Sequence, residues 1–88
     1  MADYNITVKA SVEKDIRKIP ADITAKIFEH IEALSADPFP HDSRKLSGAE
    51  HLYRIRVGEY RIIYEMILED KEITIMYIRY RSNAYRNL

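Results

Sequence analysis

The dipeptide Gly58-Glu59 and its surroundings constrain the fold more than any other part of the chain. β-branched and aromatic residues dominate the sequence on both sides of it, which is typical of strands. Glycine readily adopts a positive φ and suits the first central position of a two-residue type II′ turn, with Glu59 second. We therefore predict that residues 53–57 and 60–67 form an antiparallel hairpin, the first part of a three-strand meander.

The register of this hairpin separates apolar from cationic side chains, because strand side chains alternate between two faces. One face carries the apolar side chains Tyr53, Ile55, Val57, Tyr60, Ile62 and Tyr64. The opposite face, which we call the arginine face, carries Arg54, Arg56 and Arg61, with Arg56 directly opposite Arg61. Like charges placed opposite each other on a sheet cost up to ~1 kcal/mol.

This unfavourable arrangement indicates a functional site, because packing does not require it. Three guanidinium groups on a rigid sheet can bind a phosphate through paired hydrogen bonds, and they stay charged at physiological pH. The alternative is that these arginines are solvated, or partly paired with Glu59 and Glu65.

The position of Arg79 depends on the second hairpin, which the sequence leaves open. A two-residue turn at Asp70-Lys71 would place Arg79 opposite Ile62, on the apolar side. One extra loop residue or a β-bulge would place it opposite Ile63 instead. Because an arginine is disfavoured in an apolar core, we predict the odd loop.

The first half of the chain is predicted to form one strand and two helices. Residues 4–9 alternate in the manner of a half-buried strand. Ser11 is a suitable cap for a short helix that breaks at Pro20, and a second amphipathic helix should end before Pro38. Residues 41–51 form a polar connection. The predicted class is α+β: an N-terminal strand, a helical hairpin, a three-strand antiparallel meander and a short C-terminal tail, with the helices on one face of a twisted antiparallel sheet.

Length, charge and cysteine content narrow the possible classes of protein. The 88 residues suit a single domain spanning residues 1–88. The 14 basic and 14 acidic residues give a net charge of zero, yet residues 73–88 contain arginines and no acid. The absence of cysteine excludes disulfides, a thiol nucleophile and cysteine-ligated zinc. Because no apolar run resembles a membrane span or signal peptide, we expect a cytoplasmic protein without a membrane partner.

No metal or cofactor is expected. His41 and His51 have no carboxylates at a metal-ligand spacing, and neither Gly48 nor Gly58 lies in a phosphate-binding glycine loop. A histidine near the arginine face could still act as an acid or base.

The chain resembles the RelE/ParE superfamily of toxins of type II toxin–antitoxin systems, specifically the RelE-like mRNA interferases. The resemblance spans nearly the whole chain and rests on Lys45-Leu46-Ser47-Gly48, on "LYRIRVGEYRIIYE" and on the tail "RYRSNAY". It implies a single RelE-like toxin domain whose open sheet face binds RNA. It also implies a metal-independent endoribonuclease that cleaves mRNA in the ribosomal A site by 2′-hydroxyl attack, giving a 2′,3′-cyclic phosphate and inhibiting translation.

The resemblance also implies roles for particular residues. The catalytic residues that it implies are Arg61, Arg79, Tyr85, Arg54 and Arg56, and the RNA-binding residues are Arg81, Lys45 and Arg44. Arg61 matches the position that binds the scissile phosphate. Arg79 matches the one that stabilises developing charge or protonates the leaving oxygen, and Tyr85 the one that stacks on the nucleotide or orients it. Arg54 and Arg56 stand where the best-known RelE pattern has lysines. Since arginine retains its proton, we expect these two residues to act electrostatically and not as a general base.

The resemblance implies a cognate RelB-like antitoxin as partner, besides mRNA and the ribosome. The toxin–antitoxin complex is expected to bind operator DNA through the antitoxin. Two alternatives remain open at this stage. One is a ParE-like gyrase inhibitor without nuclease activity, and the other is a catalytically silent partner whose arginine face docks an acidic antitoxin helix.

Overall fold

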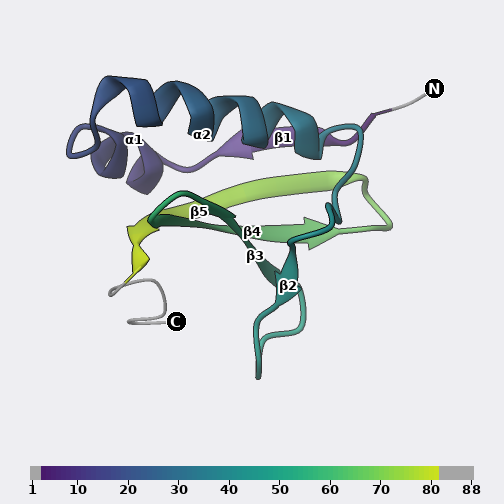
Figure 1. Cartoon of the computed structure of the whole chain (residues 1–88). Helices are drawn as coiled ribbons and strands as arrows, with labels where there is room; N and C mark the ends of the chain where they lie inside the picture. Colours follow the sequence, from purple (N-terminus) through teal and green to yellow (C-terminus); the bar gives the residue numbers. More distant parts are fainter. Residues whose placement is uncertain (1–2, 82–88) are drawn as a thin grey trace.

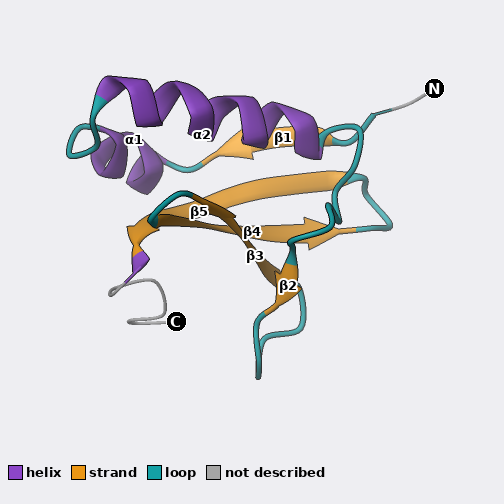
Figure 2. Ribbon diagram, viewed as in Figure 1, coloured by secondary structure: helices purple, strands orange, loops and turns teal. Residues whose placement is uncertain are grey.

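The computed structural model describes residues 3–81, which form a five-stranded sheet with two helices on one face (Figures 1 and 2). In chain order the elements are β1 (Asn5–Val8), α1 (Ala10–Ile16), α2 (Ala21–Leu34), β2 (Arg44–Lys45), β3 (Leu52–Val57), β4 (Tyr60–Ile67) and β5 (Glu72–Tyr80). The strand order across the sheet is β1-β5-β4-β3-β2. The predicted α+β class, with an N-terminal strand, a helical hairpin and a meander, is confirmed.

The prediction of a wholly antiparallel sheet is wrong, because the sheet is mixed. The first strand lies beside the last one and runs parallel to it, with Asn5 opposite Glu72 and Val8 opposite Ile75. The meander itself is antiparallel throughout. The direction of β1 depends on how the two helices return the chain across the sheet, and local alternation in the sequence carries no information about that path.

A fifth, very short strand was not predicted. The connection 41–51 contains β2, in which Arg44 lies opposite Arg54 and Lys45 opposite Tyr53 on β3. Two residues are too few to produce a recognisable alternation, so the sequence alone indicates only a polar loop. Its presence matters because it extends the sheet on the side of the cationic residues.

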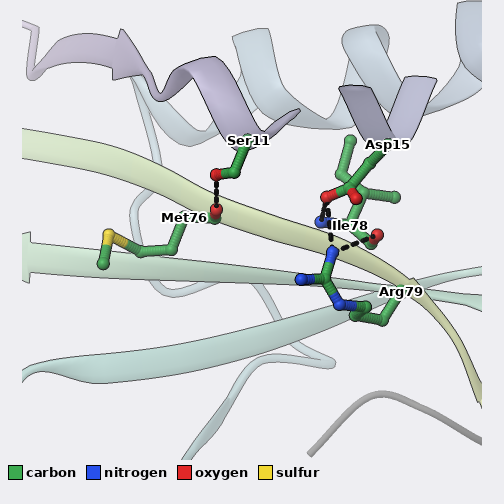
Figure 3. Close-up of polar contacts among 5 residues, drawn as sticks. All are labelled: Ser11, Asp15, Met76, Ile78 and Arg79. Atoms are coloured by element: carbon green, nitrogen blue, oxygen red, sulfur yellow. Dashed lines mark hydrogen bonds and ion pairs between the residues drawn. The ribbon is translucent and has the colours of Figure 1, made fainter. Parts of the chain in front are cut away.

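The two helices begin and end close to their predicted positions, but the predicted cap at Ser11 is wrong. Ser11 lies inside α1, and its hydroxyl donates to the backbone carbonyl of Met76 on β5 at 2.7 Å (Figure 3). The second helix ends at Leu34, before Pro38, as predicted. Within residues 3–81, neither helix is long and apolar enough to cross a membrane.

The core lies between the helices and the apolar face of the hairpin. That face contributes Ile55, Val57, Ile62 and Tyr64 as buried residues, while Tyr53 and Tyr60 pack against them half-buried. The helices contribute Val12, Ile27, Ile31 and Leu34. Fully burying one such aliphatic side chain contributes about 1.5–3 kcal/mol. This burial outweighs the repulsion of the like charges on the other face.

Tyr64 anchors the segment that follows α2 to the sheet. Its ring stacks on Tyr53 with centroids 5.8 Å apart, and its hydroxyl donates to the Pro38 carbonyl at 2.7 Å. The residue is fully buried. Burial disfavours the phenolate and raises the pKa of Tyr64 to about 12.

This raised pKa predicts how stability depends on alkaline pH. The folded state keeps a proton that an unfolded tyrosine, with its ordinary pKa of 10.0, releases first. The free energy of unfolding should therefore be level up to about pH 10 and fall by about 3 kcal/mol as the pH rises through about 12. Urea unfolding at a series of pH values measures it.

The variant Tyr64→Phe isolates this contribution. Its free energy of unfolding at neutral pH should be about 1 kcal/mol lower, because the hydrogen bond to Pro38 is lost. Most of the decrease in stability at alkaline pH should disappear. Tyr80→Phe is the control, because Tyr80 is 44% exposed. An unchanged alkaline decrease in Tyr64→Phe would show that another group causes it.

Candidate nucleic-acid interface

The β3–β4 hairpin has the predicted turn and register. Gly58 has a φ of +59°, a conformation that side chains disfavour, and the strands join at Gly58-Glu59. Arg56 lies opposite Arg61, and Arg54 lies opposite Ile63. The three arginines therefore share the face that points away from the helices, which confirms the predicted arginine face.

The second hairpin places Arg79 directly opposite Arg61 on β4. The predicted partner, Ile63, is wrong, although Arg79 does avoid the apolar side. Residues 68–71 connect the strands, and a β-bulge after Ile63 shifts the register partway along. The predicted odd loop is wrong, because the connection 68–71 has four residues; the bulge, the other arrangement considered from the sequence, moves Arg79 away from the apolar face.

The pairing arranges the side chains of this face in two rows across the strands. The first row, which we call the arginine row, consists of Arg79, Arg61 and Arg56. The second consists of Tyr77, Ile63, Arg54 and Arg44. Arg56 and Arg44 are exposed, while Arg54, Arg61 and Arg79 are half-buried. Five cations thus converge on one surface of a chain whose net charge is zero.

The arginines at the centre of this surface are not neutralised by nearby acidic residues. Within the part of the chain that the structure describes, neither Glu59 nor Glu65 forms an ion pair with Arg54, Arg56 or Arg61. Glu59 instead pairs with Arg81, from carboxylate Oε2 to guanidinium Nε, at 2.8 Å. The local alternative, in which Glu59 and Glu65 neutralise the arginine face, does not describe this geometry.

The loop before β2 fixes the outer arginines. Nη1 of Arg44 donates to the carbonyls of Ser43 at 2.7 Å and His41 at 3.3 Å, and Nη1 of Arg54 reaches the Asp42 carbonyl at 3.4 Å. Backbone carbonyls orient these side chains without cancelling their positive charge. Both guanidiniums therefore remain able to attract an anion.

A pocket adjoins these outer arginines. Its volume is about 490 Å³, and its lining combines cationic with small and apolar side chains: Arg44, Lys45, Leu46, Ser47, Gly48, Ala49, Leu52 and Arg54. Lys45 is exposed on β2, where it can contact a ligand at the pocket rim. The mixture of cations and apolar carbon suits a ligand with a flat ring next to a negative charge.

Arg79 has a carboxylate partner that sequence reasoning missed. Its Nη1 lies 2.6 Å from Oδ2 of Asp15 on α1 (Figure 3). Its guanidinium carbon lies 4.6 Å from the centre of the Tyr77 ring. Arg79 and Asp15 are 64 positions apart in sequence. No local pattern could reveal such a pair, because it depends on how α1 packs against the edge of β5.

Of the sequence-predicted site residues, Tyr85 lies outside the described residues, and Arg81 lies at their end. Arg81 is exposed, and its backbone N–H donates to the Glu59 carbonyl at 2.8 Å. Over residues 3–81, no cluster of three or more histidine and acidic side chains is placed to hold a metal ion.

Known proteins of similar sequence and structure are toxins of toxin–antitoxin systems. Residues 6–85 match the model of a family described as the ParE toxin of the type II toxin–antitoxin system parDE. "Putative toxin RelE1" of Methanocaldococcus jannaschii is 33% identical over 87 residues, which cover 96% of this chain and 97% of that protein. Toxin RelE of Mycobacterium tuberculosis is 26% identical over 84 residues, 94% of this chain and 87% of that protein.

Solved structures agree with these sequence matches. The chain aligns with a crystal structure of the archaeal RelE–RelB complex from Pyrococcus horikoshii OT3 with a TM-score of 0.82 and 31% identity, over 93% of this chain and 99% of that one. The toxin–antitoxin complex RelBE2 of Mycobacterium tuberculosis shares the fold, with a TM-score of 0.78, 24% identity, and coverage of 93% of this chain and 95% of that one. On the family model and the archaeal relatives together, this chain belongs to the ParE toxin family of type II toxin–antitoxin systems, within the RelE/ParE superfamily.

Proposed function

We propose that this toxin is a metal-independent endoribonuclease that cleaves messenger RNA in the ribosomal A site and thereby inhibits translation. The observation that carries the proposal is the arginine row, Arg79, Arg61 and Arg56, on three neighbouring strands of one sheet. Guanidinium groups bind phosphate through paired, charge-assisted hydrogen bonds and retain their proton. The row therefore suits a reaction in which negative charge accumulates on a phosphate.

The proposed reaction is an intramolecular transesterification of RNA. The ribose 2′-oxygen bonds to the adjacent phosphorus, and the bond between that phosphorus and the 5′-oxygen breaks, leaving a 2′,3′-cyclic phosphate and a 5′-hydroxyl. The 2′-hydroxyl releases its proton to water or to a ribosomal group, and the 5′-oxygen takes up a proton from water or from a ribosomal group. Negative charge grows on the phosphoryl oxygens between these events, where preorganised cations each contribute a few kcal/mol of stabilisation.

The roles proposed for the arginines combine their positions in the sheet with the family motif. Arg61 binds the scissile phosphate, because it lies in the middle of the row with Arg56 on one side and Arg79 on the other. Arg79 stabilises the leaving oxygen, and Arg54 adds positive charge from the second row. Tyr85 is proposed to stack on the nucleotide or orient it, a role suggested by the motif alone.

The neighbouring phosphates of the RNA are proposed to bind on either side of the arginine row. Arg44 and Lys45 line the 490 Å³ pocket at one side of the sheet, which offers apolar carbon to a base and cations to its phosphate. Arg81 serves the other side. Its pair with Glu59 is exposed, and such pairs contribute about 0–1 kcal/mol, so a phosphate can displace it.

An antitoxin related to RelB is the proposed protein partner, and operator DNA is proposed to bind to the complex through that antitoxin. The structures compared above from Pyrococcus horikoshii OT3 and Mycobacterium tuberculosis are themselves toxin–antitoxin complexes. This chain offers an antitoxin the unneutralised arginine face together with exposed apolar side chains, namely Val8, Phe28, Phe39, Leu68 and Tyr80. A partly disordered acidic segment that folds on binding would cover both kinds of surface.

One other function has a specific observation in its favour. The family whose model matches this chain is described as the ParE toxin of parDE, which supports the alternative that the protein is a gyrase inhibitor. That function requires a protein-binding surface and no phosphate chemistry, so it gives no reason for Arg56, Arg61 and Arg79 to face one another. A gyrase supercoiling assay run beside the cleavage assay separates the two functions.

Replacing Arg61 is the most direct test of the nuclease proposal. Arg61→Ala should lower single-turnover cleavage of mRNA on programmed ribosomes by about 10²–10³, the usual cost of losing one charge-stabilising donor. Arg17→Ala is the matched control, because Arg17 is an exposed arginine at the end of α1. Mapping of cleavage ends by primer extension measures both. Wild-type protein that inhibits supercoiling without cutting mRNA would contradict the proposal.

The arginines at the lysine positions give a second test. Arg54→Lys and Arg56→Lys should keep or raise the cleavage rate, since a lysine keeps the charge and can also lose a proton. For the unaltered protein, the rate plotted against pH should show no ionisation near pH 6–7 that belongs to a histidine. An inflection there that vanishes in His41→Ala or His51→Ala would make histidine the base.

The antitoxin proposal is tested by coexpression with the product of the neighbouring gene. A stable complex should elute together in size-exclusion chromatography, and Arg56→Glu should weaken it, because Arg56 is the exposed member of the arginine face. Arg17→Glu, which reverses the same charge on α1, should leave the complex intact. Separate elution of the two unaltered proteins would refute this partnership.

A further inference from the structure

Asp15 makes two bonds at the end of β5 that bear on the arginine row. Its Oδ2 accepts from the backbone N–H of Ile78 at 2.9 Å and from Nη1 of Arg79 at 2.6 Å (Figure 3). The Asp15 side chain is only 17% exposed and that of Arg79 only 30%. One carboxylate oxygen therefore ties the arginine side chain to the backbone of its own strand.

This carboxylate stands where a neighbouring strand is missing. β1 pairs with β5 only as far as Ile75, so the polar groups beyond it lack a strand partner on that side. Side chains of α1, one helical turn apart, take over: Ser11 donates to the Met76 carbonyl, and Asp15 accepts from the Ile78 N–H. The helix thus covers the edge of β5, and of the two side chains that make these bonds only Asp15 is charged.

The same bonds immobilise the Arg79 side chain. Its guanidinium also lies over the Tyr77 ring, at 4.6 Å, and reaches the Ile78 carbonyl at 3.2 Å. A free arginine side chain loses rotamer entropy when it becomes ordered. Because Asp15 orders it beforehand, and offsets its repulsion with Arg61 across the strands, the row is assembled before an anion arrives.

We propose that Asp15 is a positioning residue, which holds Arg79 in the arginine row at the expense of some affinity for the anion. This inference rests on the nuclease proposal for its effect on rate, but the ordering of Arg79 can be measured without any activity. Two effects of opposite sign follow. The carboxylate keeps Arg79 in place for the transition state, and its negative charge weakens the attraction of the row for RNA.

The variant Asp15→Asn separates these effects, because it keeps an oxygen for the Ile78 N–H and removes the charge. It should bind a 2′-O-methyl RNA trinucleotide, which lacks the nucleophile, about twofold more tightly at low salt. It should cleave mRNA roughly tenfold more slowly at saturation, since small misplacements of catalytic groups carry costs of this size. A role in stability alone would lower the active fraction without tightening binding.

Two matched controls come from the same helix. Ser11→Ala removes the other bond between α1 and the β5 edge without altering charge, and should change neither affinity nor rate in the folded protein. Glu13→Gln removes one negative charge from the exposed side of α1, and measures the general effect of net charge on RNA binding. Thermal melts confirm that each variant is folded.

Nitrogen-15 relaxation of the Arg79 Nε–H provides the readout that needs no catalysis. The signal should report an ordered side chain in wild type, Ser11→Ala and Glu13→Gln, and a mobile one in Asp15→Asn. If Asp15→Asn does not fold, Asp15→Glu replaces it: the longer side chain should mobilise Arg79 while leaving RNA affinity unchanged.

An Arg79 signal that stays ordered in both Asp15 variants would overturn the inference, and so would a fall in rate without the gain in affinity that removal of the charge predicts. If the wild type cleaves no mRNA, the nuclease proposal fails. The relaxation and trinucleotide binding then decide the role of Asp15 by themselves: mobility with tighter binding supports it, and unchanged values refute it.

Discussion

The two-residue turn at Gly58-Glu59 is the constraint on which the rest of the structure depends. It fixes the register of β3 and β4, and therefore which side chains of the two strands share a face. A one-residue shift would move every side chain of one strand to the opposite face. Ile55 and Ile62 would then lose burial that contributes about 1.5–3 kcal/mol each. The repulsion between Arg56 and Arg61 is smaller, up to ~1 kcal/mol. Burial therefore wins, and the arginines are held together on the open face.

The arginines on that side of the sheet differ in whether they pair with a carboxylate. Arg79 on β5 pairs with Asp15 of α1, and Arg81, the residue after β5, pairs with Glu59 of the hairpin turn. Arg56 and Arg61, on the central strands, meet none among residues 3–81. An incoming phosphate would therefore be attracted most strongly to the middle of the sheet. Cations that are fixed by the sheet need little reorganisation to stabilise charge there.

Arginine at positions 54 and 56 separates the proposed chemistry from acid–base catalysis by lysine. An arginine contributes charge and geometry but no proton transfer at physiological pH. Under the proposed function, the site would therefore depend on order: the carbonyl of Asp42 orients Arg54, and Asp15 orients Arg79. The same open, cationic surface would suit an acidic antitoxin, so inhibition and RNA binding would compete for one face.

The register of the first hairpin and the face occupied by Arg54, Arg56 and Arg61 could be read from the sequence, because alternation and a two-residue turn are local properties. The residue opposite Arg79 could not be read from the sequence. It depends on the four-residue connection 68–71 between β4 and β5 and on a β-bulge for which the sequence has no characteristic residue. The parallel pairing of β1 with β5 and the contact between Asp15 and Arg79 were likewise decided only by tertiary packing. They join segments more than 60 positions apart, and such contacts form because α1 closes an edge that exists only once the sheet is assembled.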